Sequence, residues 1–248
     1  MLELLAVAAA GAAAGFVNSV AGGGALITFP TLVALGLPPL SANVTLTVGI
    51  VPASAGGALG YLDLLREQRE RFARLLAPLI LGAGAGAVAL LLTSNAAFEG
   101  IVPLLIALSC LLLFFQPRLT PRIAHAGNER SPYLLGGIFF CGAYGAYFGA
   151  AVSILILAIL ALFVADTIQH LNGMKIVLAG GANLVGAFLY AFLAPVDWRY
   201  ALTIMVFSFA GGRVGAHFAR RIPSDPLRIA IAAIGLAVAA VLALRAFG

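Results

Sequence analysis

Two cationic side chains of this chain lie inside apolar stretches, where a charge is costly. Lys175 lies about one turn into the segment 171–193, and Arg213 lies within FSFAGGRVGAHFARR. The acidic residues, in contrast, fall near segment ends or in loops. Ionisable groups at membrane depth are functional candidates, and buried positive charge is unfavourable unless something neutralises it. The pattern indicates an anion site; the alternative is that both side chains extend along their stems to the cytoplasmic interface.

A run of three glycines interrupts the apolar stretch GFVNSVAGGGALITFP at residues 15–30. Glycine permits the positive backbone dihedrals of a tight bend, and its missing side chain lets a solute approach the backbone. The N–H groups at the start of the following helix would also face an anion favourably. We interpret the run as a helix break or hairpin tip within the bilayer; close helix packing is the alternative. Packing is our interpretation of six other glycines, which are Gly82, Gly84, Gly86, Gly211, Gly212 and Gly215.

Uncharged polar residues follow the glycine-rich bend in each half of the chain, as Asn43 and Thr45 do in the first half. Hydroxyls and amides can replace an anion's water by hydrogen bonding, although each alone can equally join two helices. His170 either titrates near neutral pH or caps a helix start. The predicted substrate-binding residues are Asn18, Ser19, Gly22, Gly23, Gly24, Asn43, Thr45, Tyr144, Tyr147, His170, Asn172, Lys175, Asn183 and Arg213.

The composition indicates which elements must position these residues. Of the 248 residues, 62% are hydrophobic and 9% are charged, and the mean hydropathy is +1.10. About a quarter of the residues of a soluble domain are charged, so the chain is predicted to be an all-α integral membrane protein. The formal net charge of +5 is concentrated in short loops, as in cytoplasmic loops of membrane proteins, and does not indicate nucleic acid. Cys110 and Cys141 lie within apolar tracts, and the sequence predicts neither a metal site nor a cofactor.

Apolar segments divide evenly about a polar stretch. They are about 2–21, 24–37, 42–62, 74–93 and 97–115 before it, and about 132–148, 150–165, 171–193, 199–217 and 227–247 after it. A shift of 127 residues places Gly15 on Gly142 and Gly22 on Gly149, and the order of bend, short tract, polar bend and long helix repeats. We predict a first repeat at 1–115, a cytoplasmic linker at 116–131 and a second repeat at 132–248.

Loop charges predict the topology. Arginines concentrate in DLLREQRERFAR, in the linker and near 217–228, and we assign these loops to the cytoplasm. Each repeat then crosses the membrane an odd number of times, both termini lie outside, and the second repeat is inverted. The segments 24–37 and 150–165 correspond to roughly 21 to 24 Å of helix, against a hydrocarbon core of about 30 Å. Each repeat is therefore expected to start with a glycine-broken or re-entrant helical hairpin, a pattern that points to a transporter's central site.

The motifs resemble those of a known family. GFVNSVAGGGALITFPTLVALGLPPLSANVT is similar to the first repeat of the sulfite exporter TauE/SafE family, also called the toluene sulfonate uptake permeases, through its glycine-rich bend, Pro30 and GLPP. KIVLAGGANLVGAFLY resembles the second-repeat helix, with Lys175 and Asn183 at the Lys and Asn positions. GAAVS at 149–153 departs from the second run of glycines often found in the family. The resemblance implies transport of small anions, commonly sulfite, thiosulfate or organosulfonates.

The sequence therefore predicts a secondary transporter of small anions in the inner membrane, with alternating access at a midplane site between the repeats. An anion channel, or a non-transporting membrane subunit of a larger complex, is the alternative. An enzyme is not expected, because the sequence has no intramembrane nucleophile motif, paired intramembrane aspartates or His-rich metal motif. The predicted partners are the anion and the lipid bilayer, and the oligomeric state is left open, a homodimer included.

Overall fold

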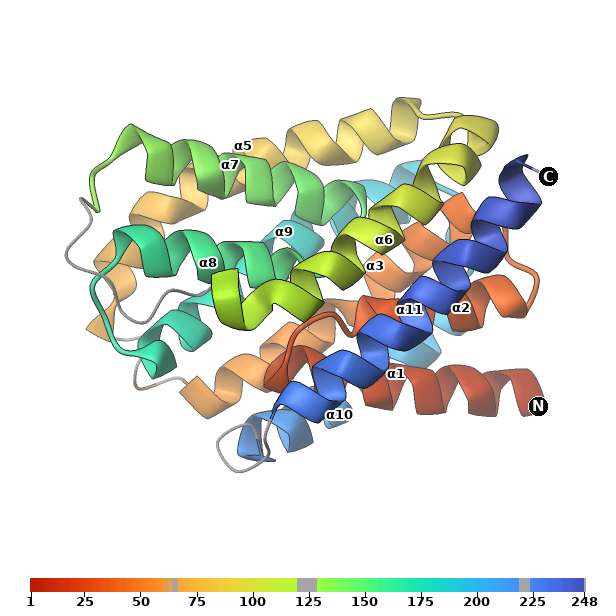
Figure 1. Ribbon diagram of the computed structural model, residues 1–248, viewed down its shortest axis with the longest axis horizontal. Coiled ribbons are helices and arrows are strands. Elements are labelled where there is room, and N and C mark those ends of the chain that lie inside the picture. The colour runs from red at the N-terminus through yellow and green to blue at the C-terminus, as the bar shows by residue number, and fades with distance from the viewer. Residues whose placement is uncertain (62, 64–66, 120–128, 219–223, 248) are drawn as a thin grey trace.

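The computed structural model describes residues 1–61, 63, 67–119, 129–218 and 224–247, and this part of the chain is helical (Figure 1). The elements are α1 (Leu2–Val20), α2 (Ala25–Ala34), α3 (Pro39–Ala58), the 3-10 turn η1 (Leu59–Tyr61), α5 (Arg69–Leu92), α6 (Asn95–Leu119), α7 (Pro132–Tyr147), α8 (Val152–Phe163), α9 (Ile168–Leu193), α10 (Trp198–Phe218) and α11 (Ser224–Phe247). Within these residues, five helices are long and apolar enough to cross a bilayer: α1, α5, α6 (over Asn95–Phe115), α9 and α10. The prediction of an all-α integral membrane protein is confirmed.

Each predicted apolar segment contains one of the long or short helices, and the differences lie at the ends. α5 begins at Arg69 rather than at 74, and α6 continues to Leu119 rather than ending at 115. Hydropathy detects the part of a helix that lies in hydrocarbon, whereas the hydrogen-bonded backbone continues into the charged interface. The arginine-rich first turn of α5 is therefore helical although it is not apolar.

The short segments form half-length helices. α2 has 10 residues and α8 has 12, which at 1.5 Å per residue give about 15 Å and 18 Å of helix. Both fall well short of a hydrocarbon core of about 30 Å. α1 packs on α2 and α7 packs on α8, so each short helix folds back on its predecessor as a hairpin. In Figure 1 the first hairpin opens toward the end of the molecule that carries both termini, and the second opens toward the opposite end.

The packing of the two halves follows one pattern. α1 packs on α10 as α7 packs on α5, and α3 packs on α10 as α9 packs on α5. α2 contacts α11 as α8 contacts α6, while α3 with α9 and α6 with α11 join the halves. Exchanging the first five helices with the last five therefore returns most of the same neighbours; α3 with α6 is an exception, since α9 with α11 is not a comparable contact. This pattern supports the predicted inverted duplication, which stays a prediction together with its boundaries.

The flanks of the three basic loops lie together at the end opposite the termini (Figure 1). Much of the loop charge used for the topology prediction, including Arg66, Arg122, Arg220 and Arg221, lies outside the described residues. The assignment of that end to the cytoplasm stays a prediction. We call it the inner end, and the end with the termini the outer end.

Glycines bring α5 and α7, and α10 with α1 and α3, into backbone contact. A Cβ atom at Gly82 or Gly86 of α5 would overlap a carbonyl oxygen of α7, and one at Gly211 or Gly215 of α10 would overlap or crowd the backbone of α1. Gly212 meets the carbonyl oxygen of Ala53 of α3 in the same way. Small residues allow close approach where helices lack a hydrophobic driving force. Packing is thus confirmed for five of the six glycines so interpreted; Gly84 has nothing within 4 Å of such a Cβ.

Two neighbouring glycines of α5 provide a matched test of this contact. Gly82→Ala should destabilise the protein by about 1–3 kcal/mol, because the methyl group meets the backbone of α7. Gly84→Ala should leave stability unchanged or raise it by about 0.5–1 kcal/mol, because the site is open and alanine favours helix. Thermal unfolding in detergent measures both. Equal effects of the two substitutions would contradict the contact.

Candidate functional site

The chain breaks its helices at two places that meet inside the bundle. The first break (residues 21–24) separates α1 from α2, and the second break (residues 148–151) separates α7 from α8. Gly22 and Gly23 have φ values of 86° and 83°, and Gly149 and Ala151 have φ values of 75° and 62°. Positive φ is easy for glycine and uncommon for alanine. The stretch GAAVS therefore forms a left-handed bend with a single glycine, although it lacks a glycine run.

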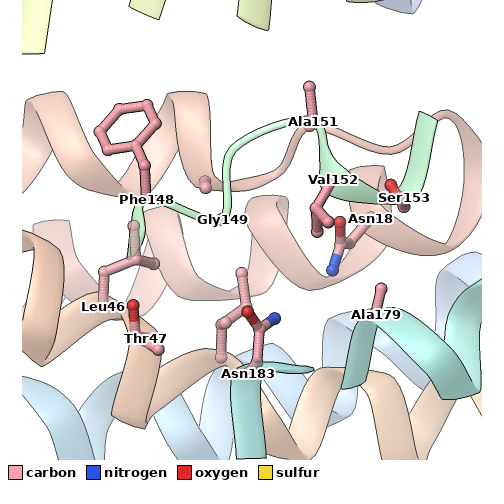
Figure 2. Close-up of a pocket in the computed structure, with 13 residues that line it drawn as sticks. Asn18, Leu46, Thr47, Phe148, Gly149, Ala151, Val152, Ser153, Ala179 and Asn183 are labelled. Carbon is pink, nitrogen blue, oxygen red and sulfur yellow. The ribbon is translucent and has the colours of Figure 1, made fainter. Parts of the chain in front are cut away.

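A small cavity lies between the two breaks (Figure 2). It is lined by residues of both breaks, of α1, α2 and α8, and of the long helices α3 and α9: Asn18, Gly23, Ala25, Leu46, Thr47, Ile50, Phe148, Gly149, Ala151, Val152, Ser153, Ala179 and Asn183. About 20 Å³ is open to the centre of a water molecule, which is room for about one water. A second space of about 10 Å³ adjoins Asn18, Ser153 and Ala179. In this conformation the site is closed.

The cavity presents neutral hydrogen-bonding groups. The amide groups of Asn18 and Asn183 point into the space below the second break, and the hydroxyl groups of Thr47 and Ser153 lie at its walls (Figure 2). Each amide can donate two hydrogen bonds and the hydroxyl of Ser153 one, whereas the hydroxyl of Thr47 already donates to the carbonyl oxygen of Asn43 at 2.8 Å. Among the residues that the structure describes, no charged side chain lines the cavity. The polar side chains that line the cavity are therefore neutral dipoles.

The backbone adds donors to this set. α2 and α8 both start at the cavity, and α2 starts directly after Gly24. In the described part of the chain no hydrogen bond is made by the N–H groups of 23, 24 and 25 at the start of α2, or of 150, 151 and 153 at the start of α8. Unpaired N–H groups and the positive end of the helix dipole make such a terminus favourable for an anion.

Some of the predicted site residues are brought together here. Asn18, Gly23 and Asn183 line the cavity. Ser19 lines the adjoining space and donates its hydroxyl to the carbonyl oxygen of Gly212 at 2.9 Å. A Cβ at Gly22 would lie 2.6 Å from Oγ of Ser153. Gly24 lies against the backbone of α1, which leaves no room for a side chain there.

Four predicted residues instead fasten helices together. Asn43 donates its amide to the carbonyl oxygen of Tyr147 at 2.9 Å, and the backbone N–H of Asp197 donates to Oγ1 of Thr45 at 2.9 Å. The hydroxyl of Tyr144 lies 2.7 Å from Oγ of Ser109, and that of Tyr147 lies 3.2 Å from Oγ1 of Thr93. None of the four side chains is among those that line the cavity. Apart from Oδ1 of Asn43, which has no partner within the described residues, their polar groups are used in hydrogen bonds between elements.

The predicted cations lie elsewhere. Lys175 is 2% exposed, but it does not line the cavity and it has an interaction partner. Arg213 is exposed, as the interfacial alternative requires, and Asn172 is half-buried away from the cavity. In this arrangement neither cation lines the cavity, and their part in substrate binding stays a prediction. The position of a residue along a helix indicates its depth in the membrane, whereas the neighbouring residues determine where a long side chain points.

His170 belongs to an ion-pair cluster at the inner end, which we call the inner cluster. Arg71 of α5 forms ion pairs with Glu129 and Asp166, each at 2.6 Å. Nδ1 of His170 lies 2.5 Å from Oδ1 of Asp166, and its Nε2 lies 3.5 Å from Oε2 of Glu67. The backbone N–H of His170 also donates to the hydroxyl of Thr167, so His170 is in the first turn of a side-chain-capped helix. The inner cluster ties α5 to the residues that precede α7 and α9.

The cluster lowers the pKa of Asp166. Burial by itself raises the pKa of this carboxyl, but hydrogen bonds from His170, Arg71 and the backbone N–H of Thr167 favour the ionised form more strongly. The net pKa lies below the ordinary value for aspartate.

Phe148, Gly149 and Ser153 line the cavity without being in the predicted set. The alignment of Gly22 with Gly149 indicated the position, because both residues have positive φ. The ring of Phe148 packs edge-on against Phe29 of α2 at 5.7 Å between centroids and lies 6.5 Å from Phe98 of α6. The sequence did not single out Phe148, because a phenylalanine in an apolar tract cannot be distinguished from an ordinary core residue.

Comparison with known proteins gives one family. A sequence model of the sulfite exporter TauE/SafE family matches residues 7–242. A "probable membrane transporter protein" of Haemophilus influenzae is 27% identical over 223 residues, which cover 87% of this chain and 85% of the relative. The "probable membrane transporter protein YfcA" of Escherichia coli is 25% identical over 82% of this chain and 76% of its own length. The "probable membrane transporter protein ORF9" of a Sinorhizobium species is 29% identical over 83% of this chain and 79% of its own length.

Acid should remove the contribution of Asp166 to stability. Because the folded-state pKa is lowered, this contribution is present above the ordinary aspartate value of about 3.9 and is lost as the pH falls through the lowered pKa. Asp166→Asn should therefore melt below the wild type at pH 7, with a difference that shrinks under acid. Melting temperatures of both proteins across pH measure this. A difference that does not change with pH, or an equal loss in the exposed Asp63→Asn control, would contradict it.

Proposed function

The chain belongs to the sulfite exporter TauE/SafE family, and from that premise we propose that this membrane transporter moves small anions by alternating access at the cavity between the two breaks. Sulfite, thiosulfate and organosulfonates are the substrate class that the family description and the motifs suggest. The membrane would be the inner membrane, with both termini outside and the inner end toward the cytoplasm.

One observation carries the proposal: two half-length helices start at the same cavity. α2 comes from the first half of the chain and α8 from the second, and both have unpaired N–H groups at their starts within the described residues. The dipole of each helix adds a partial positive charge at that point. Broken helices of this kind are typical of the central sites of transporters, where helix N-termini bind anionic groups.

Neutral donors suit a carrier that must also release its substrate. An anion bound by Asn18, Asn183, Ser153 and two helix starts loses its water in exchange for hydrogen bonds. Binding by a fixed cation would add a Coulomb attraction that grows strongly in a low-dielectric interior. Neutral dipoles therefore bind the anion less tightly than a fixed cation would, which allows the carrier to release it.

The placement of the breaks supports alternating access. The cavity has room for about one water, so an anion of several heavy atoms enters only if the two hairpins separate. The hairpins open toward opposite ends of the molecule (Figure 1). Movement of one half against the other would thus open the cavity first to one side and then to the other. A closed cavity of this size favours a carrier over a permanently open pore.

The transport test uses purified protein in proteoliposomes loaded with thiosulfate. A carrier should give saturable uptake of labelled thiosulfate that unlabelled thiosulfate on the opposite side accelerates by countertransport. Flux that rises linearly with concentration would indicate a channel, and absence of flux with sulfite, thiosulfate and taurine would refute the proposal for this substrate class.

Asparagine substitutions on one helix test the site. Asn183→Ala should weaken thiosulfate binding about tenfold, because a hydrogen bond to a charged group contributes about 1.5–3 kcal/mol. Asn172→Ala, on the same helix but away from the cavity, is the matched control and should bind normally. Ligand-induced thermal stabilisation measures both affinities. Equal affinities in Asn183→Ala and the wild type would remove this amide from the site.

A further inference from the structure

Side chains from three helices donate hydrogen bonds to the carbonyl groups of the second break and the turn before it. The hydroxyl of Tyr190 of α9 donates to the carbonyl oxygen of Ala146 at 2.7 Å. The amide of Asn43 of α3 donates to that of Tyr147 at 2.9 Å. The hydroxyl of Ser109 of α6 shares its one proton between the carbonyl oxygen of Leu105 at 2.8 Å and that of Ala150 at 3.2 Å. Tyr190, Asn43 and Ser109 are completely buried. We call these three side chains the carbonyl caps.

With the caps in place, most backbone carbonyl groups of the second break have a hydrogen-bond partner, whereas several of its N–H groups have none. The carbonyl oxygen of residue 149 accepts from the N–H of 152, and that of 151 accepts from the N–H groups of 154 and 155. From 146 to 151, in the described structure, every carbonyl except that of 148 thus accepts a hydrogen bond. The N–H groups of 150, 151 and 153 make none. The second break therefore offers free N–H donors and few free backbone acceptors, while Oδ1 of Asn43 beside it has no hydrogen-bond partner within the described residues.

This difference between carbonyl and N–H groups matters because a helix break places the partially negative end of one helix beside the partially positive start of the next. The end of α7 directs carbonyl oxygens, with partial negative charge, into the same region where α8 directs N–H groups. Free carbonyls would attract a cation and repel an anion, as they do in sites where unwound backbone coordinates Na⁺. A hydroxyl or amide donor placed on such a carbonyl offsets its partial charge.

The caps also lie close to the site itself. Tyr190 follows Asn183 by seven residues on α9, which places both on one face of the helix. Asn43 precedes Leu46 and Thr47 by three and four residues on α3, so it shares the face that lines the cavity. Tyr147 and Ala150 flank Phe148 and Gly149, which line the cavity. The capped carbonyls are therefore immediate neighbours of the lining residues.

We infer that Tyr190, Asn43 and Ser109 are specificity-determining residues that make the site selective for anions by occupying the carbonyl groups of the second break. The inference rests on the proposed function. It says that side chains outside the cavity lining determine whether the site prefers an anion or a cation. The first break has no such side-chain caps: among the described residues, no side chain donates to a carbonyl between 18 and 24. The assignment concerns the second break.

Tyr190→Phe tests the inference, because it removes one hydroxyl and keeps the ring. It should weaken thiosulfate binding about tenfold, since the freed partial negative charge on the carbonyl of Ala146 repels the anion. Sodium should restore part of this affinity when it replaces N-methylglucamine at constant ionic strength, because the cation occupies the freed carbonyl. The wild type should not respond to this exchange. Thermal stabilisation and isothermal titration with thiosulfate measure both effects.

Tyr200→Phe is the matched control. Its hydroxyl donates to Glu3 at 3.0 Å at the outer end, away from the cavity, so binding should stay normal. The inference is overturned if Tyr190→Phe binds thiosulfate as the wild type does, if both variants lose affinity equally, or if sodium has no effect on Tyr190→Phe. A wild type that binds no sulfite, thiosulfate or sulfonate would instead overturn the proposed function and the inference with it.

Discussion

The backbone of a broken helix inside a bilayer is the constraint on which this structure depends. Water is not at hand there, so each exposed N–H and C=O group needs a partner from the protein or from a ligand. The two breaks create such groups at the centre of the bundle, and the surrounding helices are arranged around them. α3, α6 and α9 supply side-chain donors to the second break, and the close glycine contacts of α1 with α10 and of α5 with α7 hold the long arms of the hairpins.

The same constraint explains why few charges are needed inside. Helix starts and amide groups provide partial positive charge without the desolvation penalty of an ionised side chain. Lys175 is buried but lies outside the cavity, and Arg213 is exposed. A site built from dipoles is fixed by backbone geometry. Its precision therefore depends on positive φ at Gly22, Gly23 and Gly149, and on residues that hold the breaks in place.

The sequence predicted the elements better than the contacts. Hydropathy located each apolar helix, and the length of 24–37 and 150–165 indicated half-length helices, because these properties depend on local composition. The pairing of Gly22 with Gly149 also followed from the repeat. Thr45 and His170, in contrast, were polar residues at a suitable depth whose partners, the N–H of Asp197 and the carboxyl of Asp166, depend on how helices pack. Ser109 and Tyr190 gave no signal, because a single hydroxyl in an apolar helix has many possible partners.

The groups that join the helices differ in charge between the two ends and the middle of the bundle. The inner cluster uses Arg71, Glu129 and Asp166 at an end where all three side chains keep some contact with water, so the cost of desolvation is moderate. At the outer end, Thr45 with the N–H of Asp197, and Tyr200 with Glu3, join helices by single hydrogen bonds. The middle is left to uncharged groups. Ion pairs fasten the end where the second hairpin opens. The hydrogen bonds that join the halves beside the cavity, from Ser19 to Gly212 and from Asn43 to Tyr147, are made by side chains other than Asn18 and Asn183, whose amides face the cavity. A carrier needs this separation, because a group that both closed the bundle and bound the substrate would tie release to the unfastening of the structure.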